Sequence, residues 1–248
     1  MIDLHCHILP GIDDGAKNTD VSVEILNEEK NQGVQAITFT PHFNCNRIDL
    51  EKFLRIREHS YQKLMAQPGV EELGIKFKLG AEIYFSTKLN EMDLEPLCFT
   101  DSNYLLIEFP TDEKPYGLRH TVVNILNKGF IPILAHVERY PYFTEDPTML
   151  YDLIEKGCIA QVNAGAIIEG SKITMKYIKW GMAQLVCSDT HNMSNRSPNM
   201  QEAFEIVERK FGKDYTAWFN KNAVNIFKGK YVDLPIPKKP KKLLGIWM

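Results

Sequence analysis

The sequence lacks the features that define several classes of protein. No apolar run in its 248 residues approaches the roughly 18 that a membrane-spanning helix needs. Its 29 Lys and Arg are balanced by 32 Asp and Glu, and the net charge of −3 gives no electrostatic case for a nucleic-acid partner. The opening MIDLHCHILPG has neither the basic nor the apolar region of a secretory signal. We therefore expect a cytoplasmic protein.

Cysteine chemistry is also excluded. The five cysteines are odd in number, widely spread and never paired as C-x-x-C, so neither a disulfide framework nor a zinc knuckle is indicated. No cysteine is followed by an arginine at the spacing C-x5-R, which a cysteine-dependent phosphatase needs to cradle phosphate. A P-loop and a G-x-S-x-G elbow are missing too, so a nucleotide triphosphatase or serine hydrolase has no support.

Short β-branched or aromatic runs alternate with stretches of helical spacing. The predicted strands are Ile2–His7, Ala36–Pro41, Ile75–Phe85, Tyr104–Pro110, Ile131–Val137, Ile159–Ala166 and Ala183–Thr190. Such alternation predicts an α/β fold with a parallel sheet and right-handed crossovers. Seven units without a Gly-rich dinucleotide fingerprint favour a TIM-like barrel over a doubly wound sheet. We expect one domain over residues 1–230 and an extended tail over 231–248.

Helix signals support this alternation. Asn18 or Thr19 is expected to cap the first helix, and an apolar stripe predicts another over Asp49–Gln67. A later helix is expected to open at Ser197 or Pro198.

Ionisable residues gather where the predicted strands end. They are His5, His7, Asp14, His42, Glu82, Glu108, His136, Asp189 and His191. In a parallel barrel these ends meet at one face, where such folds carry their chemistry. Any one of these residues alone is most often a turn former or a cap.

His5 and His7 are the most informative pair. Residues i and i+2 of a strand point to the same face, so the two imidazoles lie side by side while Cys6 points into the core. Many carboxylates and imidazoles on one face are electrostatically costly without cations, which predicts a metal site. Imidazole and carboxylate donors without thiolate suit manganese, iron or catalytic zinc.

A family resemblance adds to these inferences. The chain resembles the polymerase-and-histidinol-phosphatase (PHP) family, and within it the manganese-dependent protein tyrosine phosphatases of bacterial capsule and exopolysaccharide clusters. The motifs are HCH at 5–7, DDG at 13–15, TPH at 40–42, LGAEIYF at 79–85, LIEFP at 106–110, AHVERY at 135–140 and SDTHN at 188–192. The resemblance implies a distorted (β/α)7 barrel, the PHP fold, with a trinuclear metal centre.

The resemblance also implies a role for each site residue. His5, His7, Glu82 and Asp189 would hold the first of two or three Mn²⁺ ions, and Glu82 would bridge to a second ion completed by Glu108 and His136. Asp14, His42 and His191 would hold the third. Asp13 does not match a ligand position and is interpreted as a turn residue or a hydrogen-bond acceptor for a ligand.

Such a cluster suits the hydrolysis of a phosphomonoester. Bound metals generate hydroxide near neutral pH and neutralise phosphoryl oxygens, which fits in-line attack without a covalent intermediate. Arg139 and Arg196 follow ligands closely, and we expect them to bind phosphate as catalytic residues rather than to be ordinary loop arginines.

The resemblance implies a phosphotyrosine protein as substrate, namely an autophosphorylated bacterial tyrosine kinase of polysaccharide export. An aromatic rim could flank a phenyl ring, or the same aromatics could simply cap the barrel. These residues are Phe43, Tyr84, Phe85, Tyr116, Tyr140, Tyr142 and Phe143. Two alternatives remain open: a small-molecule phosphatase of the histidinol-phosphate type, and a non-catalytic, metal-stabilised binding module.

The predicted tail combines charge with apolar residues. Lys238, Lys239, Lys241 and Lys242 precede LLGIW at 243–247. Such a segment can make weak contact with an anionic membrane surface, or it can pack Trp247 back onto the barrel.

Overall fold

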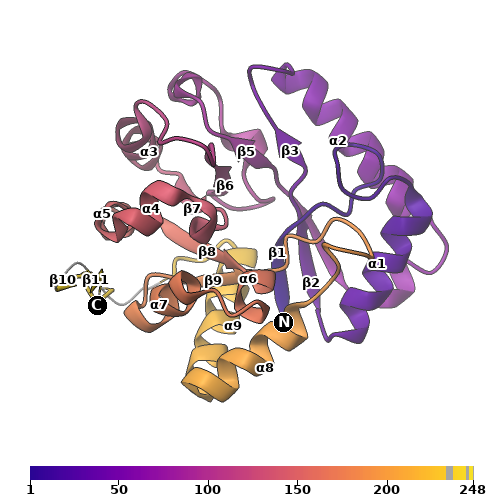
Figure 1. The fold of residues 1–248 in the computed structure, drawn as a ribbon. Coiled ribbons are helices and arrows are strands. Elements are labelled where there is room, and N and C mark those ends of the chain that lie inside the picture. The colour runs from indigo at the N-terminus through magenta and orange to yellow at the C-terminus, as the bar shows by residue number, and fades with distance from the viewer. Residues whose placement is uncertain (233–236, 244–245, 248) are drawn as a thin grey trace.

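The computed structural model describes residues 1–232, 237–243 and 246–247, with helices surrounding a centre of parallel strands (Figure 1). Its strands are β1 (Ile2–Cys6), β2 (Ala36–Phe39), β3 (His42–Phe43), β4 (Lys76–Leu79), β5 (Glu82–Tyr84), β6 (Tyr104–Glu108), β7 (Ile131–Leu134), β8 (Ile159–Asn163), β9 (Leu185–Cys187), β10 (Lys242–Leu243) and β11 (Ile246–Trp247). Its α-helices are α1 (Thr19–Asn31), α2 (Leu50–Met65), α3 (Leu118–Asn127), α4 (Pro141–Glu145), α5 (Pro147–Glu155), α6 (Ala164–Ile168), α7 (Lys172–Trp180), α8 (Met200–Phe211) and α9 (Lys213–Phe227). Four short 3₁₀ helices are η1 (Glu71–Leu73), η2 (Thr87–Asn90), η3 (Glu95–Leu97) and η4 (Val137–Arg139).

The main strands pair only in parallel, which confirms the predicted α/β class. They form a three-stranded sheet, β1-β2-β4, and a six-stranded sheet, β3-β5-β6-β7-β8-β9. The sheets do not close into the predicted barrel through continuous ladders. Among the described residues, β1 is joined to the segment after β9 by one isolated bridge, between Cys6 and Thr190.

The predicted strand Ile75–Phe85 is divided into β4 and β5, and the predicted strand Ala36–Pro41 is shortened to β2 and followed by the unpredicted β3, so the strands fall into two sheets. Pro41 separates β2 from β3, because a proline has no N–H with which to continue a ladder. Gly80 separates β4 from β5 and lies so close to Phe99 that an added Cβ would stand 2.6 Å from its ring. The chain thus passes from the three-stranded sheet to the six-stranded sheet twice, between β2 and β3 and between β4 and β5.

Alternation along the strands divides the core into an outer and an inner layer. Leu105 and Ile107 of β6 belong to the outer layer, where the strands meet the surrounding helices. Tyr104 and Leu106 belong to the inner layer, which α9 covers with Ile226. Toward the carboxyl ends of the strands, the apolar side chains of the inner layer give way to polar ones.

The helices start close to where the sequence placed them. Asn18 caps α1 by accepting from the N–H of Val21, and α2 lies within its expected range. The later helix, α8, begins at Met200 rather than at Ser197 or Pro198, because Asn199 still has an extended φ of −154°.

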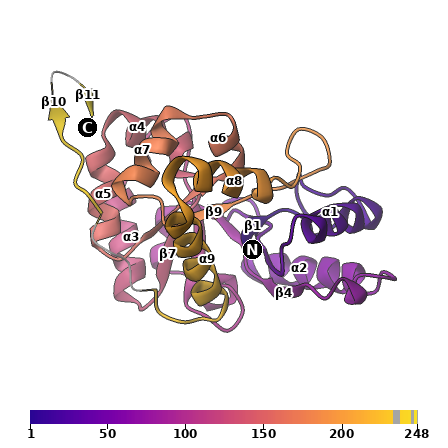
Figure 2. The ribbon, with the colours of Figure 1, turned by 90° about the horizontal axis from the view of Figure 1, so that it is seen from below.

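The described part of the tail lies against the body. The N–H of Lys238 donates to the carbonyl of Trp180 at 2.7 Å, and the indole N–H of Trp247 donates to the carbonyl of Glu145 at 2.9 Å. Figures 1 and 2 both place this segment beside α5, far from α1 and α2. Residues 233–236, 244–245 and 248 of the predicted tail lie outside the described residues. Within the described ranges, no helix combines the length and apolarity needed to cross a bilayer.

Candidate metal centre

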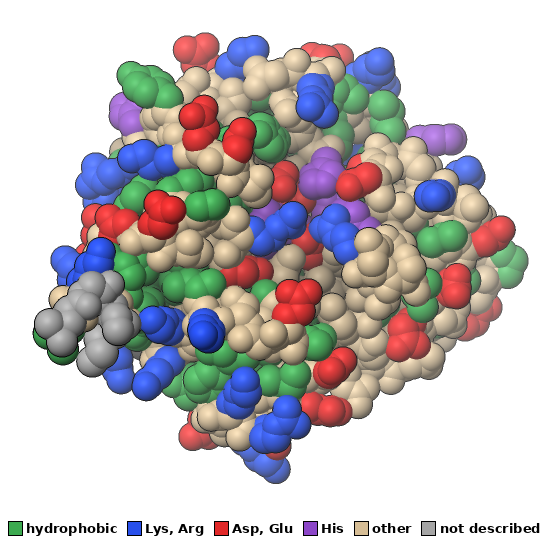
Figure 3. Space-filling view, viewed as in Figure 1, with side chains coloured by type: hydrophobic (Ala, Val, Ile, Leu, Met, Phe, Trp, Pro, Cys, Tyr) green, Lys and Arg blue, Asp and Glu red, His purple; other side chains and the backbone are tan. Residues whose placement is uncertain are grey.

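The structure brings all nine predicted ligands together at the carboxyl ends of the strands. Figure 3 shows histidines and carboxylates in a hollow on this face, with basic side chains at its edge. The residues form four groups that share members, and within each group one donor atom of every residue lies within 4.8 Å of the donor atoms of the others. These groups are His7–Asp14–His42–His191, His5–His136–Asp189, His5–His7–Glu82 and His42–Glu82–Glu108.

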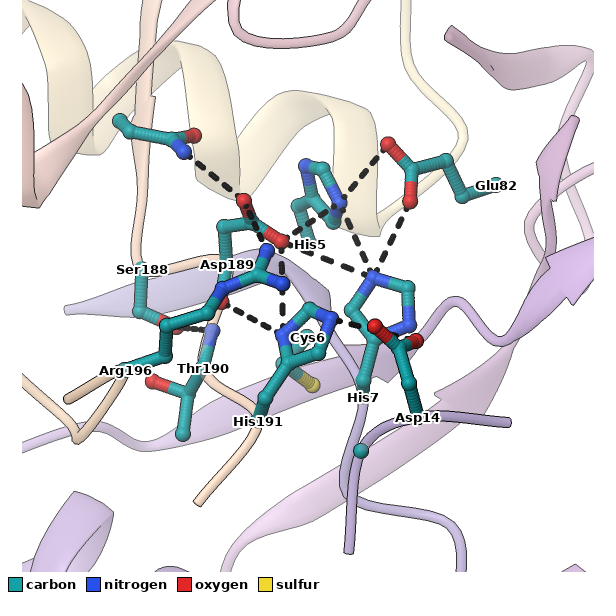
Figure 4. A network of polar contacts seen from close by, with 12 residues as sticks. His5, Cys6, His7, Asp14, Glu82, Ser188, Asp189, Thr190, His191 and Arg196 are labelled. Carbon is teal, nitrogen blue, oxygen red and sulfur yellow. Dashed lines mark hydrogen bonds and ion pairs between the residues drawn. The ribbon is translucent and has the colours of Figure 1, made fainter. Parts of the chain in front are cut away.

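His5 and His7 point into the cluster from β1 and the residue after it, as the alternation predicted. Their Nε2 atoms are 3.3 Å apart, and both rings face Glu82 and Asp189 (Figure 4). The intervening Cys6 is fully buried and its thiol lies 3.6 Å from the carbonyl oxygen of Thr38. Cys6 is therefore a core residue, as expected.

Glu82 lies at the middle of the cluster. Its Oε1 is 3.2 Å from Nε2 of His5 and 3.0 Å from Nε2 of His136. Its Oε2 is 3.1 Å from Nε2 of His7 and 3.1 Å from Nδ1 of His42. A carboxylate shared among four imidazoles has the geometry of a bridging ligand.

The cluster has a buried part and a solvent-facing part. His5, His7, Glu82 and Asp189 are almost completely buried. The side chain of Asp14 is 65% exposed and reaches Nε2 of His42 at 3.3 Å. The group that holds Asp14 is therefore the one through which the cluster meets solvent.

The donor set fits metal ions by distance. Two ligands about 2.1 Å from one ion stand about 3.0 Å apart at an octahedral angle and about 3.4 Å apart at a tetrahedral one. The contacts of Glu82 with His5, His7 and His136, at 3.0–3.2 Å, lie in this range. Among the described residues, Asp189 Oδ1 and His191 Nε2 are buried without a hydrogen-bond partner, which a cation at this centre would supply.

Four histidines also make a polar contact through Nδ1, on the side of the ring away from the cluster. His5 contacts Gln161, His7 contacts Asp13, His136 contacts the hydroxyl of Tyr140, and His191 contacts the carbonyl of Asp189, all at 2.8–3.2 Å. A metal-binding histidine usually donates its other N–H in this way, which fixes the ring and its tautomer. Asp13 is thus a hydrogen-bond partner of a ligand, one of its two expected roles.

Two amides that contact the ligands were not predicted from the sequence. Gln161 and Asn163 lie on β8 and connect His5, His136 and Asp189. Their signal was available, because both are polar residues at alternate positions of the strand IAQVN. They share a face with Ile159, which belongs to the inner core layer.

The backbone around the ligands is strained or tightly packed. His136 and Asp189 adopt positive φ angles of 30° and 56°, which cost non-glycine residues on the order of 1–3 kcal/mol. Gly15 lies against His7, where an added Cβ would stand 2.0 Å from the His7 carbonyl oxygen. Only glycine lets the loop carrying Asp13 and Asp14 approach β1 so closely.

The pKa values follow from this crowding. Burial alone would lower the pKa of His5, but the charges of Glu82 and Asp189 raise it to about 9. Burial would raise the pKa of Glu82, yet the charge of His5 and hydrogen bonds from His136 and His42 hold it well below its usual range. Burial and the charge of His7 lower the pKa of His191 to about 3. The buried carboxylates therefore favour positive charge at the centre, and bound cations would supply it.

Both predicted arginines lie beside the cluster. Nη2 of Arg196 donates to Asp189 Oδ2 at 2.6 Å, and Nη1 of Arg139 is 3.5 Å from the same oxygen. Both side chains remain partly exposed beside the buried Asp189.

The expected aromatic rim is mostly absent. Phe43, Phe85, Tyr140 and Phe143 are buried in the core. Tyr84 and Tyr142 are partly exposed, and Tyr116 is 94% exposed. For the buried four, the alternative of a cap on the fold is the correct one.

Comparisons with known proteins find similar chains over nearly the whole length of this one. The family model for capsular polysaccharide synthesis, CpsB/CapC, matches residues 1–228. The chain is 33% identical to tyrosine-protein phosphatase YwqE of Bacillus subtilis, over 100% of both chains. It is 32% identical to tyrosine-protein phosphatase CpsB of Streptococcus pneumoniae, over 86% of this chain and 91% of that one. A chain from the crystal structures of YwqE and CpsB, described as unique metal-dependent tyrosine phosphatases, aligns with a TM-score of 0.86 and 29% identity over 98% of this chain and 100% of that chain.

Proposed function

This chain belongs to the CpsB/CapC family of capsular polysaccharide synthesis, and from that premise we propose that it is a metal-dependent phosphatase that hydrolyses phosphotyrosine on proteins. The observation that carries the proposal is the convergence of nine imidazole and carboxylate side chains into groups whose donor atoms lie within 4.8 Å of one another. Metal-dependent relatives with the same activity in their names support it.

The nine residues would hold two or three ions, with Glu82 shared between them. Oxygen and imidazole donors without thiolate suit Mn²⁺, and Fe or Zn remain compatible. When bound, such ions lower the pKa of a coordinated water and neutralise phosphoryl oxygens. The proposed ligands are His5, His7, Asp14, His42, Glu82, Glu108, His136, Asp189 and His191.

The protein's own residues would then orient the substrate. Arg139 and Arg196 are held by Asp189 at the edge of the cluster, and we assign them the phosphoryl oxygens that the ions leave uncovered. Asp13, Tyr140 and Gln161 keep the imidazole rings turned inward.

Turnover with defined substrates tests the proposal. With Mn²⁺ added after chelation, we expect a phosphotyrosine peptide to be hydrolysed with a higher kcat/KM than histidinol phosphate. The reverse preference would favour the small-molecule phosphatase, and metal binding without any turnover would favour the binding module. Alkylation of the thiols with iodoacetamide is the control and should leave activity intact, since four of the five cysteines are buried.

We assign an autophosphorylated bacterial tyrosine kinase that controls capsule or exopolysaccharide synthesis as the physiological substrate. The capsule-synthesis family supports this assignment. Dephosphorylation of a purified kinase of this type, followed by anti-phosphotyrosine blotting, tests it.

The proposed organisation keeps a phosphatase domain over residues 1–230 and a tail over 231–248. The family match over residues 1–228 supports this boundary. The alternation of strands and helices supports a distorted fold of the PHP type, in which one bridge between Cys6 and Thr190, rather than a continuous ladder, joins the first strand to the segment after β9. Five free thiols fit the reducing cytoplasm.

The tail lysines support weak contact with an anionic membrane surface. Lys238, Lys239, Lys241 and Lys242 are exposed beside Leu243, whereas Trp247 is anchored to the body through Glu145. Each lysine near such a surface contributes about 1 kcal/mol. Wild-type protein should co-sediment with phosphatidylglycerol vesicles at low salt, and a variant with all four lysines changed to Gln should not. Equal sedimentation of both would contradict this contact.

A further inference from the structure

We propose that Gln161 and Asn163 are positioning residues that set the tautomer and orientation of the metal ligands. The inference rests on the proposed metal-dependent function and extends it to two amides of β8. Gln161 is fully buried, and Asn163 is partly buried at the carboxyl end of the same strand. Their side chains point to the same face, directly beneath the cluster.

The polarity of the Gln161 amide is fixed by the backbone. The N–H of His136 points at Gln161 Oε1 over 2.7 Å, and a backbone N–H can only donate, so the atom facing it is the oxygen. The same oxygen is 3.2 Å from Nδ1 of His5. The His5 Nδ1 must therefore carry a hydrogen, so in the neutral, metal-binding form of the ring the lone pair is on Nε2, which faces the cluster.

The other end of the network is fixed by a carboxylate. Nε2 of Gln161 donates to Asn163 Oδ1 at 2.8 Å, and Nδ2 of Asn163 donates to Asp189 Oδ2 at 2.8 Å. Because a carboxylate only accepts, the direction of every hydrogen bond from His136 to Asp189 is determined. Oδ2 of Asp189 is thereby occupied, and Oδ1 faces Nε2 of His5 at 3.3 Å (Figure 4).

One network thus controls three ligands, which come from β1, the residue before η4 and the segment after β9. It orients His5 and Asp189 directly. It also holds the backbone of His136, whose φ of 30° is unfavourable for a residue with a side chain. The buried hydrogen bond from the His136 N–H to the Gln161 oxygen stabilises this backbone conformation of His136.

Gln184 offers a matched control. It is also fully buried at the start of a strand, accepts from the N–H of Ala160 at 2.7 Å, and donates to the carbonyl of Gly181 at 3.0 Å. It has the same chemistry as Gln161 but contacts backbone groups rather than ligands. Gln161→Met and Gln184→Met remove the same polar atoms with little change of volume.

The test is Mn²⁺ affinity, measured by electron paramagnetic resonance of the free ion during titration. We expect Gln161→Met to weaken Mn²⁺ binding roughly 10–100-fold, the usual effect of losing a partner of a metal ligand. Gln184→Met should bind Mn²⁺ as the wild type does. Gln161→Glu keeps an oxygen toward His5 and His136, and should retain more affinity than Gln161→Met.

Activity provides an independent measurement. The Mn²⁺ concentration for half-maximal turnover should rise with Gln161→Met, while kcat at saturating Mn²⁺ should recover. A purely structural role would lower the Tm of both Met variants alike and leave the Mn²⁺ constants unchanged, which would overturn the inference. If Gln161→Met does not fold, Asn163→Ala provides the same titration at a less buried position. Failure of the wild type to bind Mn²⁺ would instead contradict the proposed function.

Discussion

The metal centre and the C-terminal tail use charge in opposite ways. At the metal centre, imidazoles and carboxylates from segments as distant as β1 and the residues after β9 are mostly buried, and His5 makes polar contacts through both ring nitrogens. In the tail, four lysines within five positions remain exposed, and the segment is anchored through Trp247 and backbone groups. The contrast indicates that the metal centre has the strained backbone and buried charge that the proposed chemistry requires, whereas the charges of the tail lie in solvent.

The largest expected effect comes from removing a buried ligand. Asp189 contacts His5, Arg196 and Asn163, so Asp189→Ala removes a donor together with the anchor of the arginines. We expect phosphatase activity to fall by about 10³-fold or more, corresponding to a loss of about 4 kcal/mol of transition-state stabilisation. Metal content measured by atomic emission should fall with it.

Asp152→Ala is the matched control, because Asp152 is exposed on α5. It should keep wild-type turnover and metal content. Full activity of Asp189→Ala would remove the basis for treating the cluster as the catalytic centre.

The arginines separate phosphate binding from metal binding. Arg139→Ala or Arg196→Ala should lower kcat/KM for a phosphotyrosine peptide by about 10²–10³-fold, as loss of a charge-stabilising donor does. Metal content should remain near normal, because neither side chain is a ligand. Arg55→Ala, on the exposed face of α2, serves as the control. Wild-type kinetics in both site variants would refute the assigned role.

Gly15 tests whether close backbone packing maintains the solvent-facing part of the cluster. In Gly15→Ala, the new Cβ would meet the carbonyl oxygen of His7 at 2.0 Å, so the loop carrying Asp14 must move. We expect destabilisation by about 1–3 kcal/mol, as overpacking usually causes, and weaker Mn²⁺ binding.

Thermal unfolding and Mn²⁺ titration measure the two effects. Gly165→Ala is the control, because its nearest neighbour would be a side-chain atom 3.6 Å away. Similar behaviour of the two variants would show that the loop tolerates the shift.

Much of the metal centre was readable from the sequence because strand ends are local features. The pair His5 and His7, and the carboxylates ending later strands, need only alternation and a parallel sheet to converge. The alternation of Gln161 and Asn163 on their strand marks them as polar residues of the inner face, but it does not reveal their partners, because His5 and His136 lie 156 and 25 residues from Gln161. The division of the predicted strand 75–85 at Gly80 and the additional strand β3 after Pro41 depend on sheet pairing and on Phe99, which no local pattern reveals.

The smallest expected effect concerns the tail and completes the comparison. Trp247 donates to the carbonyl of Glu145, and its own carbonyl accepts from Lys176 at 2.9 Å. Trp247→Phe removes the indole hydrogen bond, worth about 1 kcal/mol, and trims a ring that packs against the core and contacts Lys242, so for a chain of this size the Tm should fall by roughly 2–4 °C. Leu243→Ala, at a side chain 59% exposed, should change the Tm less. Turnover of a small phosphomonoester should be unchanged in both, because the hydrogen bonds of Trp247 are with α4 and α7, which carry none of the nine donors. A fall in kcat with Trp247→Phe would show instead that the tail and the metal centre are coupled through α4.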